Sequence, residues 1–225
     1  GLPDDKCFID SDALLQADRL ADAVFVCTQD RQHHDPTCQA LRKGYHVLVE
    51  KPMAVQAEEC ASMVACAERE GRSIAVCHVL RYTPFYMNIK QLLTSGVIGD
   101  IITVEHTENV AYWHYAHSYV RGNWRSASES SPMILAKSCH DLDILSWLID
   151  RPCESVASFG CLTHFKMENA PDGAPKRCLD GCPHAGSCPY YAPRLYTGTE
   201  QDWQMHYTRR AVTPEPGEDA LHQAL

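Results

Sequence analysis

The most regular part of the chain alternates short apolar runs with a polar helical segment. Ala23–Thr28 and His46–Val49 are apolar and rich in β-branched residues, which favours buried strands. Between them the pattern predicts a helix over about Pro36–Lys43, ended by Gly44. Ser73–His78 is predicted as the next strand. Strands that alternate with helices predict an α/β fold with a parallel sheet, which binds ligands at the carboxyl ends of its strands.

Amphipathic spacing and end signals predict further helices. Ala57–Arg69 gathers its apolar residues on one face and is followed by Gly71. Pro84–Thr94 begins with a proline, as helices often do, and Ser138–Ile149 is predicted as another helix. A last helical pattern covers Glu218–Leu225.

Two strands and a long loop are predicted after residue 95. Ile101–Asn109 alternates apolar and polar residues, which indicates a half-exposed strand, and Ser155–His164 resembles a strand as well. Residues 110–131 are polar and aromatic and are expected to form a loop. Loops of this length are usually functional or disordered, and the aromatic content favours function.

Polar residues follow two of the predicted strands at the points where these end, namely Thr28–Asp30 and Glu50–Pro52. The order strand, T-x-D-x-x-H, helix, G-x-H-V-L-x-E-K-P resembles the Gfo/Idh/MocA family of NAD(P)-dependent oxidoreductases. The resemblance implies a partial Rossmann-like parallel sheet in residues 1–80. It implies that residues 81–225 form an α+β domain with a large open sheet for substrate binding and oligomerisation, including a Cys-rich loop at 169–200.

One motif of this family is not found in the sequence. Its members begin with a Gly-rich turn, G-x-G-x-x-G, whose backbone N–H groups hold the pyrophosphate. The present sequence contains no such motif and starts at Gly1. We therefore expect a chain truncated by roughly two βα units at its start, and truncated at its end as well. As given, the chain is expected to bind dinucleotide poorly and to be inactive alone.

By the resemblance, the catalytic groups are His140, Lys51 and Lys137. Leu135–Asp143 is similar to the family's catalytic helix, and His140 matches its histidine, the base that takes the hydroxyl proton. Studied sugar dehydrogenases carry an aspartate where this chain has Ala136. Lys137 instead shares a helix face with His140, would lower its pKa and offers a hydrogen bond to substrate. A packing or capping role is the alternative for His140.

The resemblance also implies the cofactor, NAD or NADP, and the residues that contact it. Lys51 points at the nicotinamide and the substrate hydroxyl, and in relatives the bond before the following proline is often cis. The contacts expected from the strand ends are Thr28, Asp30, His33, Glu50, Lys51 and Pro52, with Arg81 facing the nicotinamide pocket. Family members often have Pro-Asn where this chain has Gln29-Asp30. The residue that separates NAD from NADP is expected in the missing part.

The aromatic and cationic residues of 110–131 are candidates for substrate binding. Sugars are bound by aromatic faces and directional polar groups in concave sites. His114, Arg121 and Trp124 are therefore predicted to contact substrate. An ordered loop or an oligomer contact with aromatic anchors is the alternative, because Trp, Tyr and Arg also dominate interfaces.

Three cysteines spaced C-x3-C-x5-C lie in a stretch rich in proline and glycine. Thiolates bind zinc tetrahedrally or hold iron–sulfur clusters. Cys178, Cys182 and Cys188 are therefore expected as ligands of a structural zinc or an iron–sulfur cluster. The fourth ligand would be Cys161, His164, His184 or a residue beyond Leu225. Free thiols or a disulfide are the alternatives.

The composition limits the kinds of partner that the chain is expected to bind and the cellular compartment in which it is expected to work. The chain has 20 basic and 29 acidic residues, a net charge of −9, and no basic block, which argues against a nucleic-acid partner. No apolar run approaches the roughly 18 residues of a membrane span. The remaining cysteines are scattered through predicted strands and helices, where free cysteine behaves as a small hydrophobe. A reducing cytoplasm is therefore expected.

Together these features predict an oxidoreductase that transfers hydride between NAD(P) and a hydroxyl-bearing carbon of a sugar, cyclitol or glycoside. A homodimer or homotetramer formed through the open sheet is implied by the family. One alternative is a glycosidase of the same fold that oxidises its substrate transiently and shows no net NADH. The other is a non-catalytic binding module stabilised by metal, which would survive replacement of His140 and fail on chelation.

Overall fold

The computed structural model describes residues 3, 6–197, 208–209, 212–213 and 218–224. The chain forms two compact units, which we describe separately. Unit 1 consists of Gly1–Thr107 and Ser130–Cys153. Unit 2 consists of Glu108–Glu129 and Glu154–Leu225.

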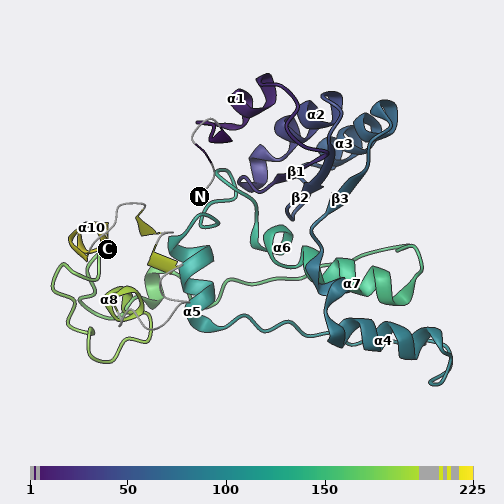
Figure 1. Cartoon of the computed structure of the whole chain (residues 1–225). Coiled ribbons are helices and arrows are strands. Elements are labelled where there is room, and N and C mark those ends of the chain that lie inside the picture. Colours follow the sequence, from purple (N-terminus) through teal and green to yellow (C-terminus); the bar gives the residue numbers. More distant parts are fainter. Residues whose placement is uncertain (1–2, 4–5, 198–207, 210–211, 214–217, 225) are drawn as a thin grey trace. The chain divides into compact units, whose positions relative to one another are not determined.

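Unit 1 is built on a three-stranded parallel sheet in the order β1-β2-β3 (Figure 1). The strands are β1 (Ala23–Val26), β2 (His46–Val49) and β3 (Ile74–Val76). They pair in register, so that the last residues of the three strands are direct neighbours. The predicted α/β fold with a parallel sheet is therefore confirmed, and the loops that leave the three strands start from one edge.

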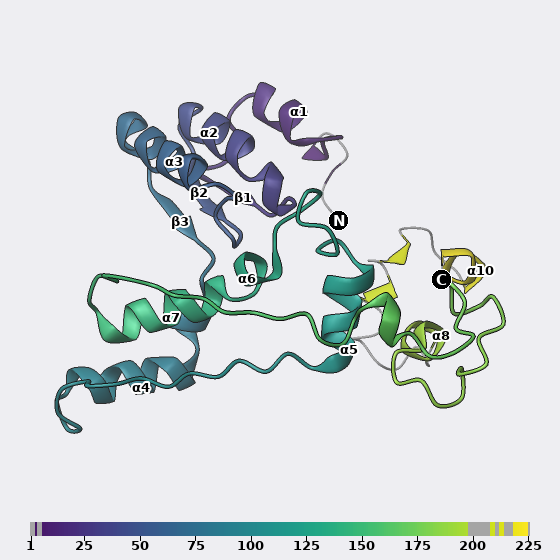
Figure 2. The ribbon, with the colours of Figure 1, turned by 180° about the vertical axis from the view of Figure 1, so that it is seen from behind.

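Two helices supply most of the core of unit 1. α2 (His34–Arg42) packs against β1 and β2, and α3 (Ala57–Glu70) lies beside α2 (Figures 1 and 2). Leu41 of α2 and Met63 of α3 are completely buried. In β2, burial alternates along the strand, as the period of two requires when helices cover one face of the sheet more closely than the other. Both helices were predicted to within two residues at each end.

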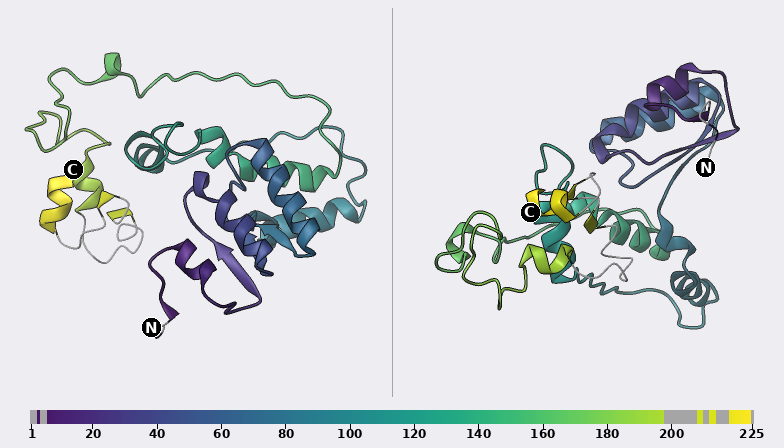
Figure 3. Two further views of the ribbon diagram at one scale, coloured as in Figure 1. Left: turned by 90° about the horizontal axis from the view of Figure 1, so that it is seen from above. Right: turned by 60° about the vertical axis from the view of Figure 1, so that its left-hand side comes forward.

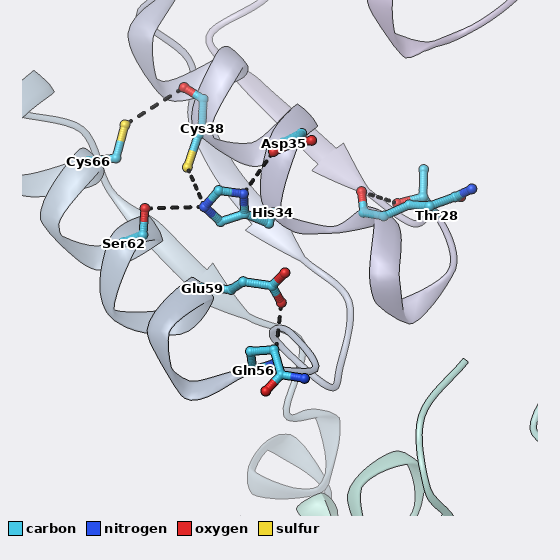
Figure 4. A network of polar contacts seen from close by, with 9 residues as sticks. Thr28, His34, Asp35, Cys38, Gln56, Glu59, Ser62 and Cys66 are labelled. Atoms are coloured by element: carbon cyan, nitrogen blue, oxygen red, sulfur yellow. Dashed lines mark hydrogen bonds and ion pairs between the residues drawn. The ribbon is translucent and has the colours of Figure 1, made fainter. Parts of the chain in front are cut away.

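A polar network joins these two helices (Figure 4). Nδ1 of His34 lies 2.8 Å from a carboxylate oxygen of Asp35, and its Nε2 lies 3.2 Å from the hydroxyl of Ser62 on α3. At the start of α3, the carboxylate of Glu59 accepts a hydrogen bond from the backbone N–H of Gln56 at 3.2 Å. These contacts satisfy polar groups at the start of both helices and fix their relative position.

Two further helices of unit 1 contact each other. α4 (Pro84–Thr94) begins exactly at the predicted proline, and the hydroxyl of Thr83 accepts a hydrogen bond from the N–H of Tyr86. Nζ of Lys90 donates to the carbonyl oxygen of Trp147 in α7 (Cys139–Ile149) at 2.6 Å. Because α4 packs on α7, residue 80, where the sequence predicts a domain boundary, lies inside unit 1. The remaining elements of unit 1 are α1 (Ser11–Gln16), η2 (Asp30–Gln32), η3 (Val79–Tyr82) and α6 (Met133–Ala136).

The strands predicted at Ile101–Asn109 and Ser155–His164 are wrong for this structure. Residues 101–111 and 152–163 form no helix or strand, and the second stretch is drawn in Figure 3 as irregular chain. A strand requires a hydrogen-bonded neighbour, and no described residue pairs with either segment. The large open sheet is therefore absent from the described part of residues 81–225.

Unit 2 contains short helical segments around a small core. They are α5 (Tyr112–Tyr115), the π-helical turn η4 (Ala116–Arg121), η5 (Met167–Asn169), α8 (Ala192–Tyr196) and α10 (Glu218–Ala224). α10 agrees with the predicted last helix. The prediction of a plain loop over 110–131 is wrong, because α5 and η4 occupy its first half. Aromatic rings pack on one another in this unit; the ring of Tyr115, for example, stacks on that of Phe165 with centroids 5.4 Å apart.

Among the described residues, none of the helices combines the length and the apolar character that crossing a membrane requires.

Candidate active site

Predicted site residues meet at the carboxyl edge of the sheet in unit 1. Thr28–Asp30 follow β1, Glu50–Pro52 follow β2, and His78 follows β3 after one intervening residue. The peptide bond between Lys51 and Pro52 is cis, as the resemblance implied. Parallel strands in register place these three loops side by side.

Lys51 connects this edge to the helix that carries His140. Its Nζ donates a hydrogen bond to the carbonyl oxygen of Ala136 at 2.9 Å. Ala136 ends α6, and in the next turn the backbone N–H of His140 donates to the carbonyl of Lys137 at 3.2 Å. The three predicted catalytic residues, Lys51, Lys137 and His140, are thereby brought together by the fold.

The surroundings of His140 favour its neutral form. Burial lowers the pKa of His140 below its ordinary value of 6.5, and the charges of Lys51 and Lys137 lower it further, in that order. His78 adds a smaller effect in the same direction, while Asp141 opposes it. Nδ1 of His140 is buried, and no described group forms a hydrogen bond with it. The ring is therefore unprotonated at neutral pH.

His78 is a site residue that the sequence reasoning missed. Its ring meets that of His140 edge to face, with centroids 6.5 Å apart. Burial lowers the pKa of His78, Arg81 and Lys51 add to this, and the carboxylate of Asp143, 3.7 Å from Nε2, opposes it. Its Nδ1 is also buried with no hydrogen-bond partner among the described residues. Its position after a parallel strand was the signal that could have identified it.

Arg81, predicted to face the nicotinamide, is bound to a carboxylate in this structure. Its Nε and Nη2 donate to the two carboxylate oxygens of Asp143 at 2.7 and 2.5 Å. The same pairing raises the pKa of Arg81 above its ordinary value. The guanidinium also lies over the ring of Trp147, 6.0 Å from its centroid. Arg81 therefore joins η3 to α7 and orients Asp143 toward His78.

Two predicted cofactor contacts differ in exposure. Thr28 is exposed, and its hydroxyl donates to the carbonyl oxygen of Gln32 at 3.1 Å. Asp30 is 4% exposed and accepts a hydrogen bond from the hydroxyl of the buried Ser131. Asp30 thus connects the loop after β1 to the segment that leads into α6, and Thr28 is open to a ligand.

His33, a third predicted contact, lies inside the protein. Its Nδ1 is 2.8 Å from the carbonyl oxygen of Pro52, and its Nε2 is 3.0 Å from that of Thr28. The side chain is 1% exposed. The ring cannot reach a ligand directly in this arrangement, because both nitrogens are engaged. It instead holds together the loops that follow β1 and β2.

The three predicted substrate residues lie in unit 2 and are not gathered at one place. The ring of His114 stacks on Tyr119, and Tyr119 in turn meets Trp124, with centroids 6.5 and 6.3 Å apart. Arg121 lines a cavity of about 560 Å³ that neither His114 nor Trp124 reaches. His114 and Trp124 thus both pack on Tyr119, whereas Arg121 lines the cavity.

The predicted metal ligands Cys178, Cys182 and Cys188 line the same cavity in unit 2. They are free thiols. The described residues contain no group of three or more His, Cys, Asp or Glu side chains placed to hold a metal ion. The structure therefore gives no support to the predicted zinc or iron–sulfur site.

Two family models match the chain, one over its first part and one over its middle part. Residues 3–78 match the model described as the oxidoreductase family, NAD-binding Rossmann fold, and residues 90–179 match that family's C-terminal alpha/beta domain. The chain belongs to the Gfo/Idh/MocA oxidoreductase family. The predicted family membership is therefore confirmed, and residues 3–78 correspond to the NAD-binding Rossmann fold of that family.

Individual relatives of this family resemble part of the chain. The 2,7-anhydro-N-acetylneuraminate hydratase of Escherichia coli is 28% identical over 149 residues, which are 66% of this chain and 39% of the hydratase. The chain thus spans less than half the length of the curated relatives it matches.

Solved structures of the family give the same picture. Apo scyllo-inositol dehydrogenase from Lactobacillus casei is 25% identical with a TM-score of 0.51, covering 64% of this chain and 40% of that one. The WlbA dehydrogenase from Bordetella pertussis, in complex with NADH and UDP-GlcNAcA, is 26% identical with a TM-score of 0.52, covering 63% and 40%.

Proposed function

We propose that the strand-end site of unit 1 serves hydride transfer between NAD(P) and a hydroxyl-bearing carbon of a sugar, cyclitol or glycoside. The observation that carries the proposal is the contact of Lys51 with the carbonyl of Ala136, which holds a cation beside a half-buried, neutral His140. An unprotonated imidazole next to a fixed ammonium is what abstraction of a hydroxyl proton requires. A relative named scyllo-inositol dehydrogenase, and a dehydrogenase solved in complex with NADH and UDP-GlcNAcA, support the substrate class.

Each residue has a separate task in this proposal. His140 takes the hydroxyl proton through an unprotonated ring nitrogen. Lys51 stabilises the negative charge that develops on the substrate oxygen, since a positioned cation acts most strongly where charge builds up. Lys137, on the same turn as His140, keeps the base neutral and offers a second hydrogen bond to substrate. The ring of His78 packs against that of His140, and Asp143 lies beside His78.

Bound NAD(P) supplies the hydride acceptor or donor. The exposed hydroxyl of Thr28 and the Glu50–Pro52 turn are the groups of this chain that suit its ribose and nicotinamide. The buried, unpartnered Nδ1 atoms of His78 and His140 fit a polar ligand at the same edge, because a buried polar atom is costly until it is paired. The sequence has no Gly-rich phosphate motif.

The proposal is tested by isotope transfer. The chain is incubated with myo-inositol deuterated at the ring carbons and with excess NAD⁺, and deuterium in the cofactor is measured by mass spectrometry. Transfer by the unaltered chain and its loss in His140→Ala support the proposal. Transfer that survives His140→Ala contradicts it. No transfer by the unaltered chain agrees instead with the expectation that this sequence, which has no Gly-rich phosphate motif, is inactive alone.

A relative named a hydratase gives a reason to measure isotope rather than net NADH. An enzyme that oxidises and then reduces its substrate moves deuterium to the cofactor and back, with no net absorbance change. Exchange of substrate deuterium without accumulated NADH would indicate that transient mode at the same site.

Compartment and assembly belong to the same proposal. A cytoplasmic location agrees with twelve free cysteines in the described residues. A homo-oligomer is expected from the family resemblance, and size-exclusion chromatography with light scattering measures it directly.

A further inference from the structure

Unit 2 contains a cavity whose lining residues have no task in the proposed hydride transfer. Its volume is about 560 Å³, within the range of roughly 300–1,000 Å³ for small-molecule sites. The end of η4 and the residues after it form one wall, and the Cys-rich segment with the start of α8 forms the other. Segments about 50 residues apart along the chain, around Arg121 and Lys176, therefore enclose it.

The charged residues around this cavity are all cations. They are Arg121, Arg125, Lys176 and Arg177, and no aspartate or glutamate is among the described residues that line it. The whole chain has more acidic than basic residues, 29 against 20. A lining with four cations and no described anion is therefore a local reversal of the charge of the protein, which concentrates positive potential in an enclosed space.

Most of these cations have no carboxylate partner among the residues that the structure describes. Arg121 donates from Nη2 to the carbonyl oxygen of Tyr190 at 2.5 Å, and Arg177 donates to that of Gln223 at 2.6 Å. Carbonyl oxygens satisfy a donor but leave its charge in place. Within the part of the chain that the structure describes, Arg125 alone of these cations is paired with a carboxylate, that of Glu129 at 3.1 Å, and this pair is exposed.

The guanidinium of Arg121 also interacts with the hydroxyl of Tyr196; burial raises the pKa of that tyrosine, and this interaction acts to lower it. Nη1 of Arg121 is buried, and it has no hydrogen-bond partner among the described residues. A buried charged donor without an acceptor is unfavourable, and a ligand oxygen would relieve it. Gly122, next in the chain, is packed so closely that an added Cβ would lie 2.5 Å from the carbonyl oxygen of His117. This packing fixes the backbone from which Arg121 extends.

Neutral polar groups complete the lining. Nδ1 of His117 lies 2.7 Å from the hydroxyl of Tyr196. Burial lowers the pKa of His117, and the neighbouring His114 and Arg121 lower it further, so its ring is neutral at pH 7. The exposed amide of Asn123 is a group that binds ligand hydroxyls, and the buried Tyr196 holds the neutral imidazole of His117 in place.

We propose that this cavity of unit 2 binds an anionic ligand of monosaccharide size, whose phosphate or carboxylate is held by Arg121, Lys176 and Arg177. Arginine pairs with both groups through two parallel hydrogen bonds, and lysine adds a point charge. The inference concerns the charge class of the ligand. It does not rest on the proposed hydride transfer, and it holds whether the ligand is that reaction's substrate or a separate effector.

The test is isothermal titration calorimetry on the full chain with three probes of similar size. Glucose 6-phosphate and glucuronate carry the two candidate anions, and glucose is the neutral control. We expect one or both anions to bind, glucose to show no heat, and added salt to weaken binding. The stronger anion distinguishes phosphate from carboxylate.

Matched charge removals locate the site. Lys176→Gln removes a cation of the lining, and Lys166→Gln removes one of unit 2 that is paired with Glu168 at 3.3 Å outside the cavity. Lys176→Gln is expected to weaken anion binding at least tenfold, which is about 1.4 kcal/mol, and Lys166→Gln to leave it unchanged. Arg121→Gln, checked for an unchanged far-ultraviolet circular dichroism spectrum, is expected to abolish binding.

Three results would overturn the proposal. They are the absence of binding by either anion, equal binding of glucose and the anions, and anion affinity that is the same in Lys176→Gln and Lys166→Gln. None of them depends on catalysis, so failure of the hydride-transfer assay leaves this test intact.

Discussion

Nζ of Lys51 donates a hydrogen bond to the carbonyl oxygen of Ala136 at 2.9 Å, between residues 85 positions apart in the sequence. The contact links the end of β2 to the turn before α7. A carbonyl oxygen leaves the ammonium fully charged, so the cation acts on whatever lies beside that turn. His140 is there, and its pKa is lowered by this charge.

Lys51→Met should abolish hydride transfer while the fold is retained. The substitution keeps an unbranched apolar stem and removes the charge that stabilises developing negative charge. A loss of about a hundredfold or more in rate is expected, on the scale of removing one transition-state donor. Lys90→Met is the matched control, because Lys90 also donates to a helix carbonyl, that of Trp147, at the other end of α7. Equal losses of the hydride-transfer rate in both variants would show that Lys51 serves only as a structural contact.

Two adjacent serines should respond in opposite ways to replacement by alanine. The hydroxyl of Ser131 donates to the carboxylate of the buried Asp30, whereas that of Ser130 is buried with no hydrogen-bond partner among the described residues. Ser131→Ala is expected to destabilise the fold by about 1–3 kcal/mol, the cost of removing a partner from a buried charged group. Ser130→Ala is expected to be neutral or stabilising. Urea denaturation of both variants measures the difference, and indistinguishable midpoints would refute it.

Arg81 and Asp143 should be coupled energetically. The pair forms two hydrogen bonds at 2.7 and 2.5 Å, and Asp143 is only 10% exposed although Arg81 is 37% exposed. A double-mutant cycle with Arg81→Gln and Asp143→Asn is expected to give a coupling of about 1 kcal/mol or more, above the value for exposed pairs. Additive effects on the free energy of unfolding would show that the pair is not formed in solution.

Gly122→Ala should destabilise unit 2. An added Cβ would meet the backbone carbonyl oxygen of His117 at 2.5 Å, and backbone atoms cannot move aside as a flexible side chain can. The expected cost is about 1–3 kcal/mol, the range for overpacking. Gly186→Ala is the control, since nothing lies within 4 Å of a Cβ there. A midpoint for Gly122→Ala equal to that of Gly186→Ala in thermal unfolding would contradict the packing described.

Local signals predicted the elements that are fixed locally. α4 has its predicted bounds because Thr83 caps its first turn and Pro84 suits the first helical position. β2 was also predicted exactly, since its four apolar residues lie between Gly44 with its turn and a charged tripeptide. The order of the motifs in the family resemblance predicted that Lys51 and His140 would lie close together.

Interactions between distant residues could not be predicted in this way. Ile101–Asn109 has a strand pattern, yet strands depend on a partner that no local signal specifies. The pairing of Arg81 with Asp143 joins residues 62 positions apart. His33 was taken as a cofactor contact because of its place in the motif, and only the fold reveals that both ring nitrogens face carbonyl oxygens.

Lys51 and His140 are expected to act as one electrostatic unit, and NMR titration of the His140 ring measures this coupling. A positive charge disfavours the protonated imidazole, so His140 should titrate below 6.5 and be neutral at pH 7. Lys51→Gln removes that charge and should raise the pKa of His140, while burial still holds it below 6.5. Lys166→Gln should leave it unchanged. Titration of His140 at or above 6.5 in the unaltered chain, or a pKa that does not move in Lys51→Gln, would contradict the account.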